Sequence, residues 1–204
     1  TKSGVMGLLC CALGASGKQT EFLAQWADAD MSVEAYVLKD SNGHATLRQP
    51  LLMDFQMVGS GYDDNDPWQS LLIPKTSDGK KAVGGGTKMT YRYYLQDMAF
   101  AVVLQGNADE LKVLQDALLN PVWDLYLGRK NCVPTDFIAR DMYQSLEEAF
   151  EAARSIAKTK NLISSFKVLQ GEHEGDVLTL NDVPVQFGEH KLYRDRQVTV
   201  ISRE

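Results

Sequence analysis

The chain has 204 residues, of which 44% are hydrophobic and 24% charged, enough for one compact domain or two small ones around an apolar core. Its formal net charge of −6 argues against a protein that binds nucleic acid on its own, because such proteins usually carry a basic excess. Three cysteines without regular spacing give no disulfide framework and no zinc motif, and they favour a reducing, cytoplasmic location.

The hydrophobic pattern predicts a chain of mixed helices and strands that begins with a helix. The run VMGLLCCAL at 5–13 is apolar on all sides, so we expect a buried helix. This run is too short to span a bilayer, although it also resembles the apolar core of a secretory signal. The other elements expected are helices at 19–28, 109–119 and 145–158, and strands at 32–39, 51–58, 87–95, 98–104, 165–170, 177–180 and 197–201.

Details at the ends of these elements are also predicted. Asn42-Gly43 is the signal of a type I′ hairpin turn. Asn107 or Asp109 is expected to cap the helix at 109–119, and Ser145 the helix at 145–158. The strand at 98–104 is expected to be buried, because it is almost entirely apolar.

Residues 59–86 have the composition of a loop that is long for a compact domain. Because predicted strands flank it, the region 51–95 is interpreted as one long hairpin. Its glycine triplet at 84–86 lacks the spacing of a phosphate-binding loop and is interpreted as a hinge.

The charge balance reverses between residues 75 and 94, where five cations accompany one carboxylate. In a strand, Tyr91 and Tyr93 share one face, and Arg92 lies on the other with Tyr94. Aromatic rings can stack on unpaired bases while cations such as Lys88 and Arg92 hold phosphates. The alternative is a solvated lysine loop followed by an ordinary aromatic strand.

Two further segments have the residues expected of a site that binds an anion such as phosphate. At the chain start, Lys2, Ser3 and Gly4 open a predicted helix whose backbone N–H groups can receive an anion. At 126–132 the sequence YLGRKNC places Arg129 and Lys130 beside a glycine. The alternative for this doublet is surface charge paired with nearby carboxylates.

Catalysis has little support in the sequence. His44, His173 and His190 lie in no catalytic motif, so a surface position is the default for each. Neither a metal-binding pattern nor a nucleotide fingerprint is present, and we expect no cofactor.

Four segments together carry a family resemblance: TKSGVMGLLCCALG at 1–14, QDMAFAVVL at 96–104, NPVWDLYLGRKNC at 120–132 and DVPVQFGEHKLYRDRQVTV at 182–200. In order and spacing they resemble the CasD subunits of the type I-E CRISPR surveillance complex, Cascade, which form the Cas family-five branch of the RAMP proteins. The element Tyr-Leu-Gly-Arg-Lys-x-Cys is the most specific of the four.

The resemblance implies an α+β, ferredoxin-like RAMP domain over residues 1–204, with 51–95 as a thumb hairpin. In this family a strand precedes the segment TKSG, so we expect one ahead of Thr1. The implied role is non-catalytic: binding and capping the 5′ handle of the guide RNA (crRNA) beside a backbone subunit and the large subunit. Target DNA would be met only through the complex, and no membrane is involved. The implied RNA-binding residues are Lys2, Ser3, Gly4, Lys88, Tyr91, Arg92, Arg129 and Lys130.

Two other functions stay open at this point. One is a metal-independent endoribonuclease acting on repeat RNA, for which Tyr91, Lys88 and His44 are the best candidates, since a relative in type I-C systems cleaves RNA. The other is a scaffold subunit whose tyrosine-rich hairpin contacts only protein.

Overall fold

The computed structural model describes residues 1–58, 65–72, 75–80 and 88–202. It divides into two units. The first, here called the body, comprises Thr1–Thr46 and Ala99–Glu204, and the second, the hairpin unit, comprises Leu47–Met98. The glycine triplet predicted to be a hinge lies outside the described residues.

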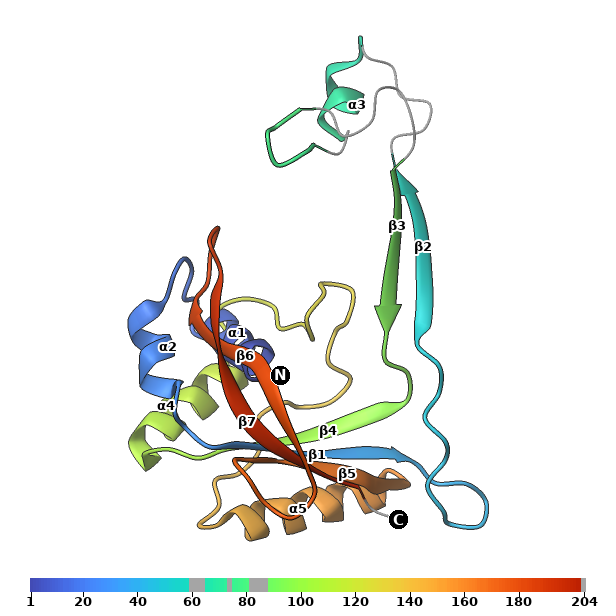
Figure 1. The fold of residues 1–204 in the computed structure, drawn as a ribbon, viewed down its shortest axis with the longest axis vertical. Coiled ribbons are helices and arrows are strands. Elements are labelled where there is room, and N and C mark those ends of the chain that lie inside the picture. Colours follow the sequence, from blue (N-terminus) through green and yellow to red (C-terminus); the bar gives the residue numbers. More distant parts are fainter. Residues whose placement is uncertain (59–64, 73–74, 81–87, 203–204) are drawn as a thin grey trace. The chain divides into compact units, whose positions relative to one another are not determined.

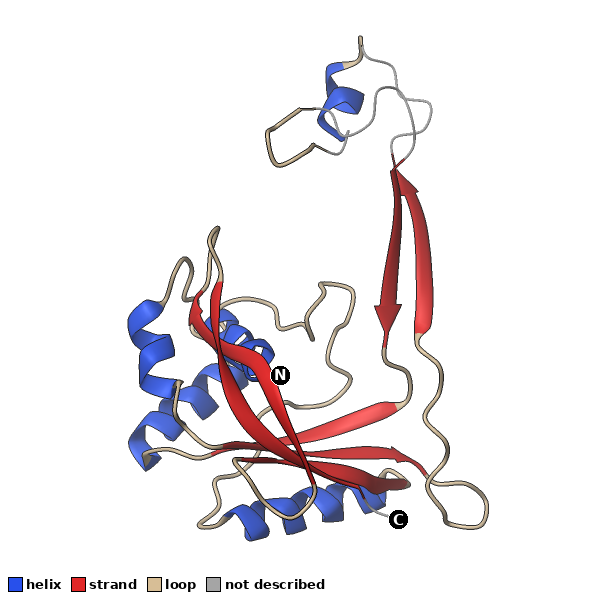
Figure 2. Ribbon diagram, viewed as in Figure 1, coloured by secondary structure: helices blue, strands red, loops and turns tan. Residues whose placement is uncertain are grey.

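A five-stranded sheet with the order β4-β1-β5-β7-β6 forms the centre of the body (Figures 1 and 2). Its strands are β1 (Met31–Leu38), β4 (Met98–Leu104), β5 (Leu162–Gln170), β6 (Asp176–Gln186) and β7 (Leu192–Ser202). The pairs β1–β5, β5–β7 and β6–β7 are antiparallel. This confirms the predicted α+β class.

Helices cover the sheet in two groups. α1 (Lys2–Ala12), α2 (Thr20–Trp26) and α4 (Ala108–Leu119) share one apolar core, whereas α5 (Leu146–Thr159) packs against β5 (Figure 2). The buried side chains of that core are Met6, Leu9, Leu23, Trp26 and Leu114. Burying such residues supplies most of the stability of short helices. Within the described residues, no helix is long and apolar enough to cross a membrane.

The capping predictions are confirmed. The Asn107 side chain accepts a hydrogen bond from the N–H of Asp109, and the Ser145 hydroxyl accepts one from the N–H of Glu148. The Glu148 carboxylate also accepts from the N–H of Gln144 at 3.0 Å, so it fixes the residue that precedes the cap.

Three local predictions were wrong. β4 is an edge strand, and Phe100 is 46% exposed, so the strand is not buried. The turn after β1 is not type I′, because Gly43 has a positive φ and Asn42 does not. Instead, the Asp40 carboxylate accepts from the N–H groups of Asn42 and His44. In the hairpin unit, α3 (Pro67–Leu72) forms where a loop was expected.

The hairpin unit contains a two-stranded ribbon of β2 (Leu52–Val58) and β3 (Lys88–Tyr94), which lies within the predicted hairpin region. Its register pairs Phe55 with Tyr91 and Asp54 with Arg92. The Gln96 side chain donates to the Pro50 carbonyl at 2.8 Å just beyond the paired strands.

Candidate nucleic-acid interface

The segment 126–132 is a closed turn in the long connection between α4 and α5. Three backbone hydrogen bonds hold it: Leu127 N–H to Cys132 O at 2.8 Å, Cys132 N–H to Arg129 O at 2.8 Å, and Gly128 N–H to Tyr126 O at 3.1 Å. Gly128 has φ +84°, a conformation that residues with a side chain rarely adopt. Arg129 and Lys130 are both exposed, so the turn presents two adjacent cations to solvent.

The residues just before this turn are attached to the end of α1. The Val122 N–H donates to the Ala12 carbonyl at 2.9 Å, and the Cys11 thiol donates to the Asp124 carbonyl at 3.3 Å. Gly14, at φ +67°, leaves room for this contact, because a Cβ there would lie 2.7 Å from Val122 Cγ1. α1 therefore anchors the connection that carries the turn.

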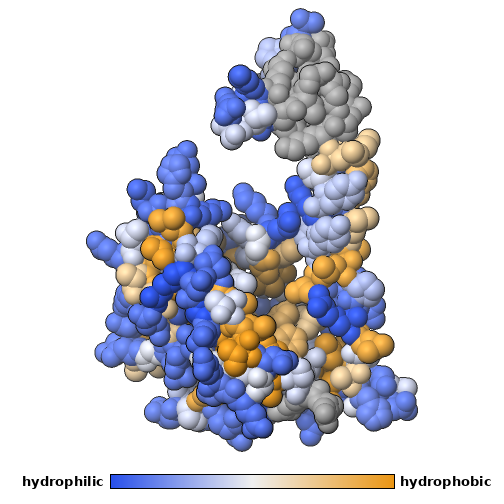
Figure 3. All heavy atoms as spheres, in the orientation of Figure 1, coloured by the Kyte–Doolittle hydropathy of each residue, from blue (hydrophilic) through white to orange (hydrophobic). Residues whose placement is uncertain are grey.

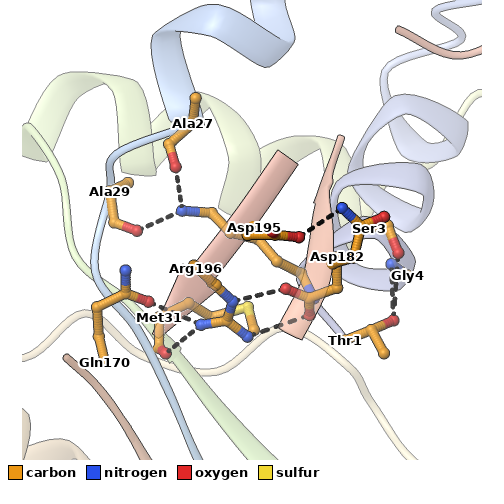
Figure 4. A network of polar contacts seen from close by, with 12 residues as sticks. Thr1, Ser3, Gly4, Ala27, Ala29, Met31, Gln170, Asp182, Asp195 and Arg196 are labelled. Carbon is orange, nitrogen blue, oxygen red and sulfur yellow. Dashed lines mark hydrogen bonds and ion pairs between the residues drawn. The ribbon is translucent and has the colours of Figure 1, made fainter. Parts of the chain in front are cut away.

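Backbone N–H groups in the first turn of α1 donate hydrogen bonds to other groups of the protein. Thr1 caps the helix by accepting from the Gly4 N–H, and a carboxylate oxygen of Asp182 on β6 accepts from the Lys2 N–H at 2.6 Å (Figure 4). An internal carboxylate thus occupies the position where we expected an external anion. A contact between Ser3 or Gly4 and RNA stays a prediction, but two of the expected donors already have partners.

Lys2 itself is buried, which corrects the expectation that its charge lies on the surface. Its Nζ donates to the carbonyls of Ala27 at 2.8 Å and Ala29 at 2.5 Å. Burial and then the charge of Arg196 lower the pKa of Lys2 to about 8. The ammonium is buried and held by these two carbonyls, so it is unavailable to a phosphate on the surface.

Arg196 completes this internal network from the neighbouring strand β7 (Figure 4). Its Nε donates to Asp182 Oδ1 at 2.7 Å and its Nη2 to Asp182 Oδ2 at 3.2 Å. Its Nη1 donates to Gln170 Oε1 at 2.7 Å. Sequence reasoning did not identify this network, because Asp182 and Arg196 are fourteen residues apart and no local sequence signal records their pairing.

The two faces of the β2–β3 ribbon differ in chemistry. Tyr91 lies on one face and Arg92 on the other, as the strand pattern predicts. The ring of Tyr91 contacts that of Phe55 with centroids 5.2 Å apart, and Tyr91 is 54% exposed. Apolar residues reach the surface along the ribbon (Figure 3). The face that carries Tyr91 consists of exposed apolar and aromatic side chains: Met53, Phe55, Met57, Met89, Tyr91 and Tyr93. Lys88 opens β3, and its side chain lies outside what the structure describes.

The predicted site residues therefore fall into three places. α1 links two of these places: Lys2, Ser3 and Gly4 lie at its start, and the connection that carries the 126–132 turn is attached at its end. An eleven-residue helix separates its ends by about 16 Å. Tyr91 and Arg92 belong to the hairpin unit.

Three other features of the described residues concern catalysis and metal binding. The His44 side chain is 80% exposed and its Nδ1 lies 3.9 Å from an oxygen of Asp40. An open hollow of about 570 Å³ beside the β5–β6 turn is lined by Glu174 and Asp176, which repel phosphate. No three His, Cys, Asp or Glu side chains in the described ranges gather closely enough to hold a metal ion.

Comparison with solved structures shows the fold. A chain of a "CRISPR RNA-guided surveillance complex" matches with a TM-score of 0.67 and 23% identity, covering 100% of this chain and 78% of that one. A "Crystal structure of Cas protein" matches with a TM-score of 0.50 and 22% identity, covering 98% of this chain and 80% of that one. These matches agree with the ferredoxin-like RAMP fold that the sequence predicts.

Comparison with protein families shows the family of the chain. No curated protein matches it. The family model of the CRISPR-associated protein Cas5, however, matches residues 1–199, nearly the entire chain. On this match, the protein belongs to the Cas5 family of CRISPR-associated proteins.

Proposed function

We propose that this protein is a non-catalytic RNA-binding subunit of a CRISPR surveillance complex of the type I-E kind, where it binds and caps the 5′ handle of the guide RNA. Family membership supports a CRISPR role. The chain also resembles a chain of an RNA-guided surveillance complex in structure, and this similarity supports the proposal that it works in such a complex. In that assembly, a backbone subunit and the large subunit are its neighbours, and target DNA is reached only through the complex.

The closed turn at 126–132 is the observation that carries the RNA-binding part of the proposal. Its backbone hydrogen bonds order the chain before any ligand arrives. Binding to Arg129 and Lys130 then costs little backbone entropy. Arg and Lys side chains bind phosphate groups more often than other side chains do. Gly128 has no side chain that would block the approach of an RNA backbone to these two cations.

The acidic net charge fits a subunit that shares its ligand with neighbours. With a net charge of −6, the isolated chain repels RNA at long range. A short basic surface such as the turn acts within about 8 Å at physiological salt, so it contributes where partners already hold the RNA. The protein is accordingly expected to bind RNA far better in its complex than alone.

Replacing Arg129 and Lys130 together with alanine tests this proposal. We expect weaker retention of a 5′-handle RNA by the co-expressed complex, and a log–log salt slope smaller by about 1.4, because two single-strand phosphate contacts are lost. Lys158→Ala with Lys191→Ala removes two other exposed cations and is the matched control, which should keep both affinity and slope. An unchanged slope in the Arg129 and Lys130 variant would remove the turn from the RNA site.

A further inference from the structure

A partly exposed indole lies in the same connection as the cationic turn, a few residues ahead of it. Trp123 is 44% exposed, so one part of its side chain is open to solvent while the rest is covered by the protein. Of the two other tryptophans, Trp26 is buried in the core of the body and Trp68 belongs to the hairpin unit. An indole offers one of the largest contact areas of any side chain, so Trp123 is a candidate for a contact with another molecule.

The backbone on both sides of Trp123 is fixed to the end of α1. The Val122 N–H donates to the Ala12 carbonyl at 2.9 Å, and the Asp124 carbonyl accepts from the Cys11 thiol at 3.3 Å. The indole is therefore held in place before any ligand arrives. A ligand that stacks on it spends little of its binding energy on ordering the chain.

One ligand of modest length can reach both the indole and the two cations of the turn. Trp123 and Arg129 are six residues apart in sequence, so their Cα atoms lie within about 21 Å of each other even if the chain between them is fully extended. At the roughly 3.4 Å spacing of stacked nucleotides, about six nucleotides of one strand cover this distance.

A single strand of nucleic acid suits both features of this surface. Its phosphates match Arg129 and Lys130, and the face of an unpaired base matches the indole. A protein partner that covered the indole and the turn with an apolar patch would have to bury two cations. The exposed carboxylate of Asp124 repels a phosphate from the neighbourhood of Trp123, so a base suits that position better than the strand's backbone does.

We infer that Trp123 is a stacking platform for an unpaired base of the RNA strand whose phosphates contact Arg129 and Lys130. The inference rests on the proposed function, because it takes the 5′ handle of the guide RNA as the ligand. It adds that the handle is single-stranded at this surface and turns one base toward the protein, since the paired bases of a duplex expose no free face to an indole.

Three substitutions of Trp123 in the co-expressed complex test this inference. Trp123→Ala should weaken the binding of single-stranded 5′-handle RNA about 5- to 150-fold, the usual effect of removing a stacking side chain, and leave the log–log salt slope unchanged. Trp123→Phe keeps an aromatic ring and should retain most of the affinity. Trp123→Leu keeps only apolar character and should lose nearly as much as Trp123→Ala. The matched control is Val133→Ala, which removes an exposed apolar side chain just beyond the turn and should bind like the wild type.

Handle RNAs that carry one abasic nucleotide test the same contact without changing the protein. At one position, loss of the base should weaken binding to the wild-type complex by a similar factor, because the sugar and phosphate remain while the stacking partner is gone. The same RNA should bind the Trp123→Ala complex as well as intact RNA does, since the contact is already missing there.

Three results would overturn the inference: undiminished affinity in Trp123→Ala, equal affinity in Trp123→Leu and Trp123→Phe, or abasic effects that are the same in the wild type and Trp123→Ala at every position. Poor recovery of Trp123→Ala in the complex, with normal RNA affinity in what assembles, would also overturn it and assign the indole to a protein contact. Equal thermal unfolding of the variants shows that a loss of affinity reflects RNA binding rather than folding.

Failure of the inference is distinguishable from failure of the proposed function. If the wild-type complex retains no handle RNA, the proposed RNA role fails and the stacking fails with it. If the Arg129 and Lys130 variant shows the smaller salt slope while Trp123→Ala binds normally, the RNA role stands and only the stacking inference fails.

Discussion

Asp182 on β6 accepts the backbone N–H of Lys2 at 2.6 Å, so a carboxylate 180 residues away in sequence completes the N-terminus of α1. The same carboxylate receives the Arg196 guanidinium through two hydrogen bonds. α1 is thereby tied to the β6–β7 hairpin at its start, and to the connection that carries Arg129 at its end.

Replacing Asp182 with alanine should destabilise the protein strongly. The change leaves the Arg196 guanidinium buried without its carboxylate, and breaking such a pair typically costs about 3–5 kcal/mol. Asp195→Ala removes an exposed carboxylate from the adjacent strand and should cost less than about 1 kcal/mol. Urea unfolding of the two variants measures the difference, and equal midpoints would contradict the role given to Asp182.

The same carboxylate predicts an acid-sensitive component of stability. Burial alone would raise the pKa of Asp182, but the hydrogen bonds from Arg196 and Lys2 N–H hold that pKa below its ordinary value of 3.8. A lowered carboxylate pKa stabilises the fold above pH 3.8, and this contribution is lost as the pH falls through the lower, folded value. Asp182→Asn should therefore flatten the decline in unfolding free energy below pH 4.

Lys2 predicts a second rise of stability with pH, in the alkaline range. Its pKa is about 8 in the folded protein and 10.5 ordinarily, so between these values the unfolded chain binds more protons and stability rises with pH. The rise is at most about 1.4 kcal/mol per pH unit. Lys2→Met lacks this titration, so the stability of the wild type relative to Lys2→Met should increase from pH 7.5 to about pH 10. A constant difference would show that the Lys2 ammonium is solvated.

Gly14 and Gly17 form a matched pair for testing the attachment of the connection to α1. Both have positive φ, but a Cβ on Gly14 would meet Val122 at 2.7 Å, whereas a Cβ on Gly17 would meet nothing within 4 Å. Each alanine variant carries a backbone cost of about 1–2 kcal/mol, and Gly14→Ala adds an overpacking cost of about 1–3 kcal/mol. Adding Val122→Ala to Gly14→Ala should recover much of that second cost in thermal unfolding.

Tyr91 and Arg92 should affect RNA binding in different ways, because they lie on opposite faces of the ribbon. If Tyr91 stacks on a base, Tyr91→Ala lowers affinity by about 1–3 kcal/mol without changing the salt slope, and Tyr91→Phe retains binding. Arg92→Ala instead reduces the slope by about 0.7. Met89→Ala, on the same face as Tyr91, is the control; equal losses for Met89→Ala and Tyr91→Ala would point to general packing of that face.

The proposed non-catalytic role predicts that repeat RNA stays intact when it is incubated with the protein in EDTA. Electrophoresis of end-labelled RNA is the measurement. Site-specific cutting that disappears in Tyr91→Phe or His44→Ala would favour the endoribonuclease instead.

Much of the local structure was determined by the sequence alone. The caps Asn107 and Ser145, the helix at 109–119 and the element YLGRKNC are recognisable because their signals lie within a few neighbouring residues. The alternation of Tyr91 and Arg92 between two faces also follows from the strand period alone. The family resemblance rests on the same kind of local information.

The tertiary structure alone decided which polar residues are internal. Lys2 looks like a surface cation in sequence, and it becomes buried because α1 packs on β6 and the carbonyls of Ala27 and Ala29 converge on its ammonium. Asp182 and Arg196 become partners only when β6 pairs with β7. Burial of a charge depends on contacts between distant segments, and no pattern within one segment records them.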